Sequence, residues 1–530
     1  MLFLYYRTPN EMGLIVGEIA LVLGTLAAPF LAAAVGGAGG QGRVRRDYAA
    51  RSASVIVGFG FAGVVIAAII AASTGISRIN IGPLFLTMDA LALLMLLLIL
   101  GLSAVIQSFA VRYLRGDSRQ SWFVVTANLV TGFSALMVSA GSIVLFTAAW
   151  VAVGGSLLLL LATYPRLAQA REGVRRAALR FAIGDLAFIA AVILILIRAG
   201  GDVPLDRLGR VTAGAPGWLL LLLAALLLLP ALARSSQIPF QGWLPATLAA
   251  PTPVSALLHA GVINAGAIFV IRFVPVLGEA TLAMTAIFLA GAATVIYATL
   301  LRLVKADVKG KLVFSTMAQM GFMMMACGLG AFAAALFHLI AHGLYKSALF
   351  LGAGAGVRRH ARQREWPVRE PVRGPILVAS IACAIVIPPA ALVLARAILA
   401  PQISIVSVAF LAFVAVTGAV SLAAMLLVRF SLDTLAIGVA STVALAFGYT
   451  AFLGVFDSLI AAPYLPSAPA SPWLLLIPAA ALLAIEIFVR LSGSAGPIRR
   501  FVYSRTLAAA TPHTRERTTP ALPTVKGVYQ

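Results

Sequence analysis

The sequence predicts an all-α polytopic membrane protein with about 14–16 transmembrane helices, arranged as two inverted five-helix repeats with discontinuous helices. Hydrophobic residues make up 62% of the 530 residues and charged residues only 11%, whereas soluble domains are about half apolar and about a quarter charged. The uncharged stretches suffice for about fifteen crossings of about 20 residues each. This composition excludes a soluble enzyme.

The apolar segments follow one another with short polar loops between them. In chain order they cover residues 13–36, 52–75, 83–111, 122–139, 140–163, 181–198, 217–233, 252–274, 281–303, 312–330, 331–353, 375–395, 405–428, 434–456 and 472–489. The first is kept as a span because its apolar run is too long for the core of a signal peptide, and Glu11 and Glu18 do not fit a basic leader.

The net charge of +22 comes almost entirely from arginine, because the chain holds only five lysines. Loops after odd-numbered segments are rich in basic residues. Loops after even-numbered segments hold little beyond Arg78, Arg198, Arg207, Arg210 and Arg272. By the positive-inside rule the odd loops face the cytoplasm, which places the N-terminus outside and, for fifteen spans, the C-terminus inside. The charge therefore indicates topology and does not indicate binding to nucleic acid.

Proline interrupts two regions, residues 229–254 and the pair Pro388-Pro389 in segment 375–395. Broken segments at matching positions of two halves are typical of transporters built from inverted repeats. The two regions are five segments apart, and consecutive units of five crossings have opposite orientations because five is odd. We expect N-terminal helices over 1–111, repeats over 112–274 and 275–428, C-terminal helices over 429–495, and a basic, partly disordered cytoplasmic tail over 496–530.

Ionisable residues inside the membrane are costly and are therefore functional candidates. His338, His342 and Lys346 lie at i, i+4 and i+8, within about 80° of one helix face and about 6 Å apart along it. Histidine and lysine can both take up and release protons, as a relay requires. The alternatives are a structural polar stripe or a lysine that reaches the membrane surface.

Four further residues are candidates, each with a structural alternative. His259 follows the proline-rich break and is otherwise a packing residue, and Arg234 precedes the break and is otherwise an anchor at the membrane surface. Asp185 lies inside segment 181–198, where a salt bridge or a helix-start role is the alternative. Lys309 belongs to a charged cluster before segment 312–330, whose alternative is a solvated loop.

The sequence predicts neither a bound cofactor nor a metal site. Cys327 and Cys383 lie in apolar segments without a second thiol at metal-binding spacing. The GxGxxG string at 58–63 lies inside a membrane segment and follows no strand, so helix packing explains it better than a dinucleotide site.

Three stretches resemble signatures of the antiporter-like subunits of respiratory complex I and of the Mrp cation/proton antiporters. They are QIPFQGWLP at 237–245 with PTPVSALLHA at 251–260, DVK at 307–309 with FSTMAQMG at 314–321, and FHLIAHGLYKSALFL at 337–351. The resemblance covers about residues 85–400 and implies a helix bundle that moves protons through central charged residues without a redox cofactor. It also implies that His259, His338, His342 and Lys346 match proton-path positions, and that Lys309 matches the charged position before its helix.

The sequence departs from that pattern at three places. Arg234 replaces the lysine of helix seven, Val151 replaces the glutamate expected after Trp150, and segment 375–395 lacks a lysine-bearing stretch. Arginine is always protonated in proteins, so a proton does not hop through Arg234 by deprotonation. These departures disfavour a standard complex I pump.

Two other strings, RYLRGD at 112–117 with Gln120 and Phe123, and HAGVINAG at 259–266, resemble the membrane subunit of DAB-type inorganic carbon accumulation complexes. That resemblance implies a partner subunit similar to a zinc-dependent β-type carbonic anhydrase, with proton influx driving CO2 hydration by the partner. It implies a multi-pass protein of the cell inner membrane. The alternatives are a subunit of complex I, of an Mrp antiporter or of a membrane hydrogenase, and a non-conducting membrane scaffold.

Overall fold

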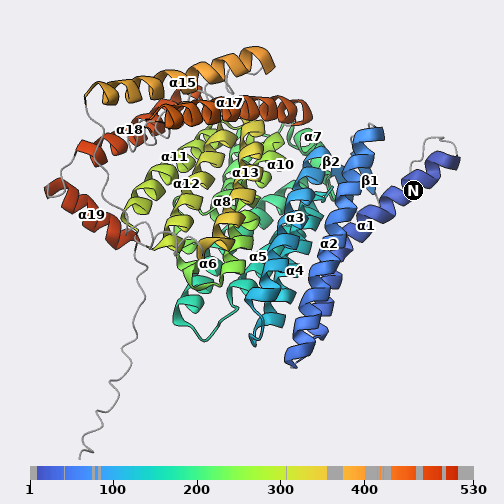
Figure 1. Cartoon of the computed structure of the whole chain (residues 1–530). Helices are drawn as coiled ribbons and strands as arrows, with labels where there is room; N and C mark the ends of the chain where they lie inside the picture. The colour runs from blue at the N-terminus through green and yellow to red at the C-terminus, as the bar shows by residue number, and fades with distance from the viewer. Residues whose placement is uncertain are drawn as a thin grey trace, which may run out of the picture.

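The computed structural model describes residues 9–40, 42–74, 78–81, 85–305, 307–354, 374–399, 431–460, 469–491 and 497–510, together with the single residues 415, 418, 422 and 426. Helices dominate these residues (Figure 1). The first half contains α1 (Pro9–Ala38), α2 (Arg43–Thr74), α3 (Ala90–Tyr113), α4 (Gln120–Val138), α5 (Ile143–Leu161), α6 (Ala168–Ala199), α7 (Leu208–Thr212) and α8 (Gly217–Arg234). The second half contains α9 (Thr252–Ala260), α10 (Ala265–Leu277), α11 (Thr281–Val304), α12 (Val308–Gly328), α13 (Phe332–Leu351), α15 (Pro375–Leu399), α17 (Leu432–Ile460), α18 (Leu476–Leu491) and α19 (Pro497–Ala510).

Twelve stretches among the described residues are long and apolar enough to cross a membrane, which confirms the predicted class. They coincide with twelve of the expected segments. Of the other three, segment 312–330 forms α12, which is not among the twelve, and segment 472–489 forms only the shorter α18 and the 3-10 turn before it. Segment 405–428 lies almost wholly outside the described residues.

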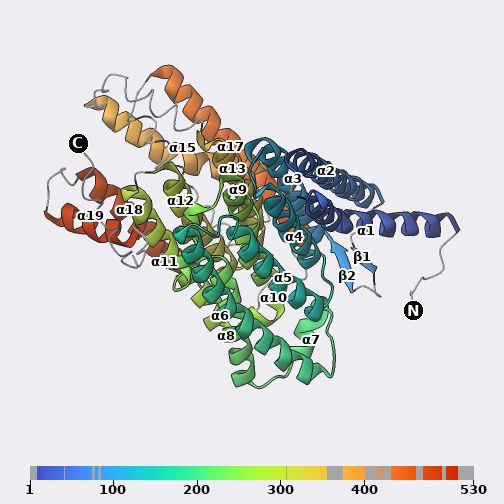
Figure 2. The same cartoon turned by 90° about the horizontal axis from the view of Figure 1, so that it is seen from below.

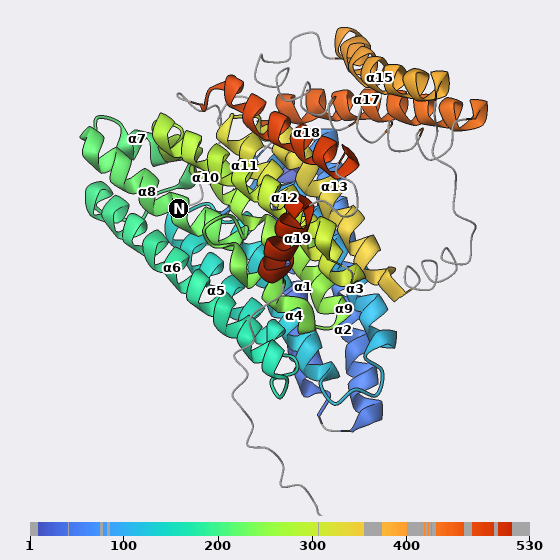
Figure 3. The same cartoon turned by 90° about the vertical axis from the view of Figure 1, so that its left-hand side faces the viewer.

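The long helices from α3 to α13 form a bundle, with α1 and α2 along one side and α18 and α19 on the other (Figures 1 and 2). Helices α15 and α17 pack against each other and lie crosswise over one end of this bundle (Figures 1 and 3). The expected break at Pro388-Pro389 is wrong, because α15 continues through both prolines. The helix continues although each proline removes one backbone donor.

A β-hairpin precedes α3, where the sequence predicts the start of a span. Strands β1 (Arg78–Ile81) and β2 (Leu86–Asp89) pair antiparallel, and the Asp89 carboxylate accepts a hydrogen bond from the Ala92 amide, capping α3. The same carboxylate pairs with Arg272, whose Nη2 lies 2.9 Å from Oδ1. Assigning Arg272 to a loop is therefore wrong, since it is 5% exposed within α10. Asp89 is therefore a structural anchor that links the start of α3 to α10.

Helix α12 is held against α11 at a contact that only glycine permits. A Cβ atom at Gly321 would lie 2.6 Å from the Gly291 carbonyl oxygen, and a Cβ atom at Gly291 would lie 2.5 Å from that of Gly321. Small residues of this kind let membrane helices approach closely. The contact therefore brings the backbones of α11 and α12 together at this level of the bundle.

Several predictions fall partly outside the described residues. Residues 497–510 of the tail form α19, so this part is helical rather than disordered, and residues 511–530 lie outside the description. The basic loop at 358–373 also lies outside it. The domain boundaries stay predictions.

Candidate functional site

Two helix breaks meet in the centre of the bundle. Helix α8 ends at Arg234, and two 3-10 turns (Gln241–Trp243 and Pro245–Ala249) lead to α9, which itself ends at Ala260 before α10 begins. The Ser235 hydroxyl donates to the Ile263 carbonyl over 3.1 Å and so satisfies an acceptor in the second break. A Cβ atom at Gly266 would lie 2.1 Å from this hydroxyl oxygen, which explains the glycine. The predicted discontinuity in this region is confirmed.

Arg234 forms a buried ion pair. Its Nη2 donates to Asp185 Oδ1 over 2.9 Å, and the Trp150 indole N–H donates to the same oxygen over 2.8 Å. The guanidinium carbon lies 4.6 Å from the ring centroid of Trp150 and 4.4 Å from that of Phe181. We call Arg234, Asp185, Trp150 and Phe181 the arginine centre. Arg234 is 1% exposed, so it is not an anchor at the membrane surface.

The guanidinium group of Arg234 occupies space beside a glycine of α5. A Cβ atom at Gly154 would lie 2.8 Å from Nη2 of Arg234, so any larger residue here would require the guanidinium group to shift. Val151, where the resemblance implies a glutamate, is 38% exposed. The acidic partner of the cation therefore comes from α6, as Asp185, rather than from α5.

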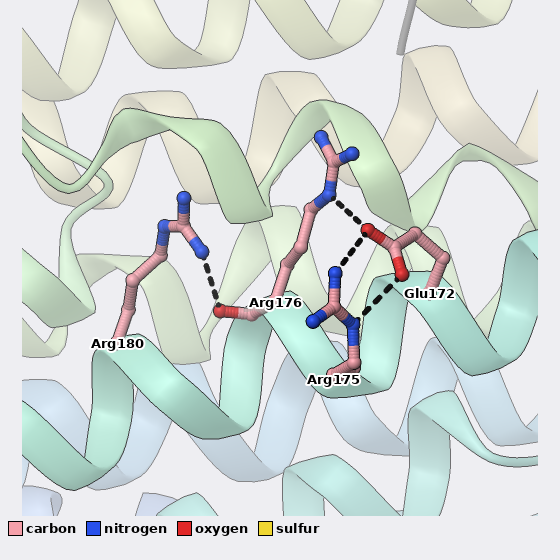
Figure 4. Close-up of polar contacts among 4 residues, drawn as sticks. All are labelled: Glu172, Arg175, Arg176 and Arg180. Carbon is pink, nitrogen blue, oxygen red and sulfur yellow. Dashed lines mark hydrogen bonds and ion pairs between the residues drawn. The ribbon is translucent and has the colours of Figure 1, made fainter. Parts of the chain in front are cut away.

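The basic end of α6 has its own partners, separate from Asp185. Glu172 accepts hydrogen bonds from Arg175 and Arg176, and Arg180 donates to the Arg176 carbonyl over 3.1 Å (Figure 4). A Cβ atom at Gly242 would lie 3.0 Å from Nη2 of Arg180, so this arginine packs on the 3-10 turn. The salt bridge considered for Asp185 is therefore present, and its partner is Arg234.

A row of polar contacts joins α12 and α13. Lys346 Nζ donates to Ser315 Oγ over 2.5 Å, and one turn along, Nδ1 of His342 contacts Oε1 of Gln319. A further turn along, the His338 ring lies 4.8 Å from the Phe322 ring between centroids. We call Ser315, Gln319, His338, His342 and Lys346 the α12–α13 seam.

Two members of the seam are fully buried, since Lys346 is 1% exposed and His342 is 2% exposed. Ser315, Gln319 and His338 are half-buried. The rings of His338 and His342 lie 5.9 Å apart between centroids. The three residues therefore lie on one face, as the four-residue spacing predicts. Their partners on the antiparallel α12 are Ser315, Gln319 and Phe322, which are spaced by four and then three residues. Ser315 and Gln319 belong to a motif in the sequence, but only the antiparallel packing identifies them as partners.

His259 lies beside the seam, on α9. It is fully buried, and its ring stacks on Phe350 at 4.5 Å with 8° between the planes. Lys346 and Lys309 act on it electrostatically. Both ring nitrogens are buried without a hydrogen-bond partner in the described part of the chain. Packing alone would favour an apolar side chain here, because a buried polar group without a partner is costly.

Lys309 connects α12 to the segment between the two breaks. Its amine donates to the Leu248 carbonyl over 2.8 Å and also to the Ala250 carbonyl. Asp307 caps the same helix by accepting from the Gly310 amide. Lys309 is half-buried, so it is not part of a solvated loop and instead holds the segment before α9 in place.

A second polar cluster, between α3 and α4, is not predicted from the sequence. The Gln107 and Asn128 side-chain amides exchange hydrogen bonds of 2.9 and 3.0 Å, and Ser103 bonds both Gln107 and Thr131. Beside Thr131, a cavity of about 30 Å³ reaches Gly261 at the break after α9. Such a volume holds about one water molecule. Isolated amides in apolar segments are the signal that could have identified this cluster.

Within the described residues, no group of three or more His, Cys, Asp or Glu side chains is placed to hold a metal ion. Both cysteines are free thiols.

Two family models match the chain. The transmembrane model of NADH:quinone oxidoreductases and Mrp antiporters matches residues 140–370, and the N-terminal model of complex I chain 5 matches residues 78–124. These regions include Asp185, Arg234, His259, Lys309 and all members of the α12–α13 seam.

Curated relatives match about half of the chain. A probable inorganic carbon transporter subunit, DabB1, of Halothiobacillus neapolitanus is 36% identical over 52% of this chain and 51% of its own length. The subunit DabB of Bacillus subtilis, also called a probable inorganic carbon transporter subunit, is 36% identical over 56% and 58%. Subunit L of the NADH-quinone oxidoreductase of Mycobacterium tuberculosis is 34% identical over 54% and 45%. The chain thus aligns with about half the length of these relatives.

Solved structures share the fold at low identity. A chain of the Mrp complex from Dietzia sp. superposes with a TM-score of 0.63 at 22% identity, covering 93% of this chain and 58% of that one. A chain of an archaeal membrane-bound sulfane sulfur reductase superposes with a TM-score of 0.58 at 18% identity, covering 93% and 96%.

Proposed function

The chain belongs to the family of antiporter-like membrane subunits found in NADH:quinone oxidoreductases and Mrp antiporters, and from this premise we propose that it conducts protons across the membrane through the α12–α13 seam. The observation that carries the proposal is the row of Lys346, His342 and His338, of which the first two are fully buried. Their partners are a hydroxyl group, an amide and an aromatic ring.

The chemistry of these partners supports conduction. A buried lysine beside a carboxylate would remain charged, whereas Lys346 donates to the neutral hydroxyl of Ser315. Lysine and histidine side chains can both exist without charge, so each can take up a proton and release it. His259 adds a further titratable ring on the neighbouring α9. Intramembrane groups of this kind typically form proton relays.

The arginine centre has a different role in the proposal. Arg234 stays protonated and is paired with Asp185, so it supplies a fixed charge beside the first helix break. The proton path therefore runs through the second half of the family domain, and Arg234 acts only through its field and its packing.

The finer assignment is a membrane subunit of an inorganic carbon uptake complex. The names of two relatives at 36% identity support it, and the seam offers a proton supply. In this assignment the partner is a large zinc-binding subunit similar to a carbonic anhydrase, and inward proton flow drives its hydration of CO2 to bicarbonate. The zinc chemistry belongs to the partner, and the assembly lies in the inner membrane.

A subunit of an NADH:quinone oxidoreductase, an Mrp antiporter or a membrane hydrogenase is the second candidate, supported by the match to subunit L. Mass spectrometry of proteins that co-purify with the full chain distinguishes the two. A large zinc-binding subunit supports carbon uptake, and quinone-reducing, hydrogenase or antiporter subunits contradict it.

Proton flux in lipid vesicles tests the core of the proposal. The full chain, with its co-purifying partner, is reconstituted with a pH-sensitive dye, and a potassium diffusion potential drives proton entry. We expect Lys346→Ala to reduce flux to the level of protein-free vesicles. Lys311→Ala is the matched control, because Lys311 lies on α12 but is exposed, and it should retain wild-type flux. Normal flux in a folded Lys346→Ala variant would contradict conduction through the seam and favour the scaffold alternative.

A further inference from the structure

The contact between His342 and Gln319 makes the two nitrogens of the histidine ring unequal. Nδ1 contacts the amide oxygen of Gln319, whereas Nε2 is buried without a hydrogen-bond partner in the described part of the chain. An amide oxygen only accepts hydrogen bonds, so a bond at this position requires the ring proton to be on Nδ1. The contact therefore selects one of the two neutral tautomers.

The contact with Gln319 disfavours the other neutral tautomer. If the proton were on Nε2, the lone pair of Nδ1 would lie against the lone pairs of Gln319 Oε1. The titratable groups around this ring are Lys346 and His338 on α13 and His259 on α9, and the backbone of His259 also interacts with the ring. None of these side chains is a carboxylate.

We propose that Gln319 is a positioning residue that holds neutral His342 as its Nδ1–H tautomer, leaving Nε2 as the nitrogen that accepts a proton. An incoming proton then binds Nε2 and gives an imidazolium that still donates from Nδ1 to Gln319. Loss of the proton from Nε2 restores the starting tautomer, so one proton enters and one leaves with no change in the number of protons on Gln319.

This tautomer has a consequence for conduction, which rests on the proposed function. The amide oxygen of Gln319 is not a base that can carry the proton onward, so His342 receives and returns protons at the same nitrogen. Transfer beyond His342 then requires the ring to leave Gln319. His342 therefore passes a proton onward only after its ring has moved away from Gln319.

Nitrogen NMR spectra of the full chain in lipid bilayers test the tautomer directly. The protein is labelled with ¹⁵N-histidine, and because it holds only five histidines, subtraction of the His342→Asn spectrum identifies the two resonances of His342. At a pH where the ring is neutral, we expect a protonated-nitrogen resonance for Nδ1 and an unprotonated one for Nε2. The opposite assignment in the wild-type protein would overturn the proposal without any need for a variant.

Variants of α12 then separate positioning from packing. Gln319→Leu removes the acceptor at similar volume, and we expect part or all of the ring proton to move to Nε2. Gln319→Glu keeps an acceptor oxygen and should retain the Nδ1–H tautomer. Ser315→Ala is the matched control, because it alters the neighbouring contact to Lys346 and should leave the tautomer of His342 unchanged. A folded Gln319→Leu variant with the wild-type tautomer would overturn the proposal.

The NMR spectrum and the proton-flux assay test the positioning role and the proposed function independently. The NMR spectrum reports the tautomer even if the vesicles show no proton flux, which would contradict the proposed function and leave the positioning role of Gln319 intact. Flux through the seam together with an Nε2–H tautomer would contradict only the positioning role.

Discussion

The arginine centre and the α12–α13 seam both bury a cation deep inside the bundle, but they surround it differently. Arg234 has a carboxylate, two aromatic faces and a glycine that fits its shape, whereas Lys346 has one hydroxyl group. The first arrangement stabilises a permanent charge, whereas the second has no carboxylate to hold the charge in place. Under the proposed function, the partners of a buried cation, rather than its burial, distinguish a structural charge from a mobile proton.

Removing the cation from the arginine centre should have the largest effect on stability. Arg234→Ala leaves the half-buried Asp185 without its cation, with only the Trp150 N–H to bind it. Breaking a buried ion pair typically costs about 3–5 kcal/mol. The double variant Arg234→Ala/Asp185→Ala removes both charges and should recover most of this loss. Thermal unfolding in detergent, followed by the loss of monodisperse protein, measures both changes.

Proton flux in the same variants sharpens the comparison. Arg234→Lys keeps the charge and should retain much of the flux, while Arg234→Ala should lose it. If Arg234→Ala folds and conducts as the wild type does, the fixed charge has no role in conduction and the arginine centre is only a packing element.

A smaller loss of stability is expected from filling the space beside the guanidinium group. Gly154→Val places its Cβ atom within 2.8 Å of Nη2 of Arg234, and overpacking of this kind typically costs about 1–3 kcal/mol. Gly155→Val is the matched control, because a Cβ atom at Gly155 meets nothing within 4 Å. Equal unfolding temperatures for the two variants would show that the arginine centre tolerates a shifted guanidinium group.

The smallest effect should come from the seam itself, through Ser315→Ala. This change removes one hydrogen bond of Lys346, worth about 1 kcal/mol, which corresponds to roughly a fivefold change in flux. Ser347→Ala is the control, because Ser347 bonds only to the backbone of its own helix. A complete loss of flux in Ser315→Ala would mean that the hydroxyl group is itself an obligatory member of the proton path.

Most of the fold follows from the sequence, because hydropathy and helix length determine which segments can cross a membrane. The common face of His338, His342 and Lys346 also follows, since helical periodicity is local. Pairings between distant residues do not follow in this way. Asp185 and Arg234 are 49 residues apart, and only the packing of α6 against α8 identifies them as partners.

Other differences have particular physical causes. Charge counting assigns every arginine near a segment end to a loop, so it misplaces Arg272, which pairs with Asp89 across 183 residues. Hydropathy also carries no information about the direction in which a helix runs relative to its neighbours. The crosswise position of α15 and α17 over the bundle was therefore not predictable. Proline alone does not determine where a helix breaks, because α15 continues through Pro388 and Pro389 and α8 continues through Pro230.

The glycine contact between α11 and α12 holds two backbone segments at the limit of close approach, because a Cβ atom at either glycine would lie 2.6 Å or less from the carbonyl oxygen of the other. At His338, His342 and Lys346, by contrast, the contacts that α13 makes with α12 come from side chains. If the seam opens and closes during the proposed proton transfer, we expect Ser315 and Gln319 to keep their places on α12 and the histidine rings of α13 to move.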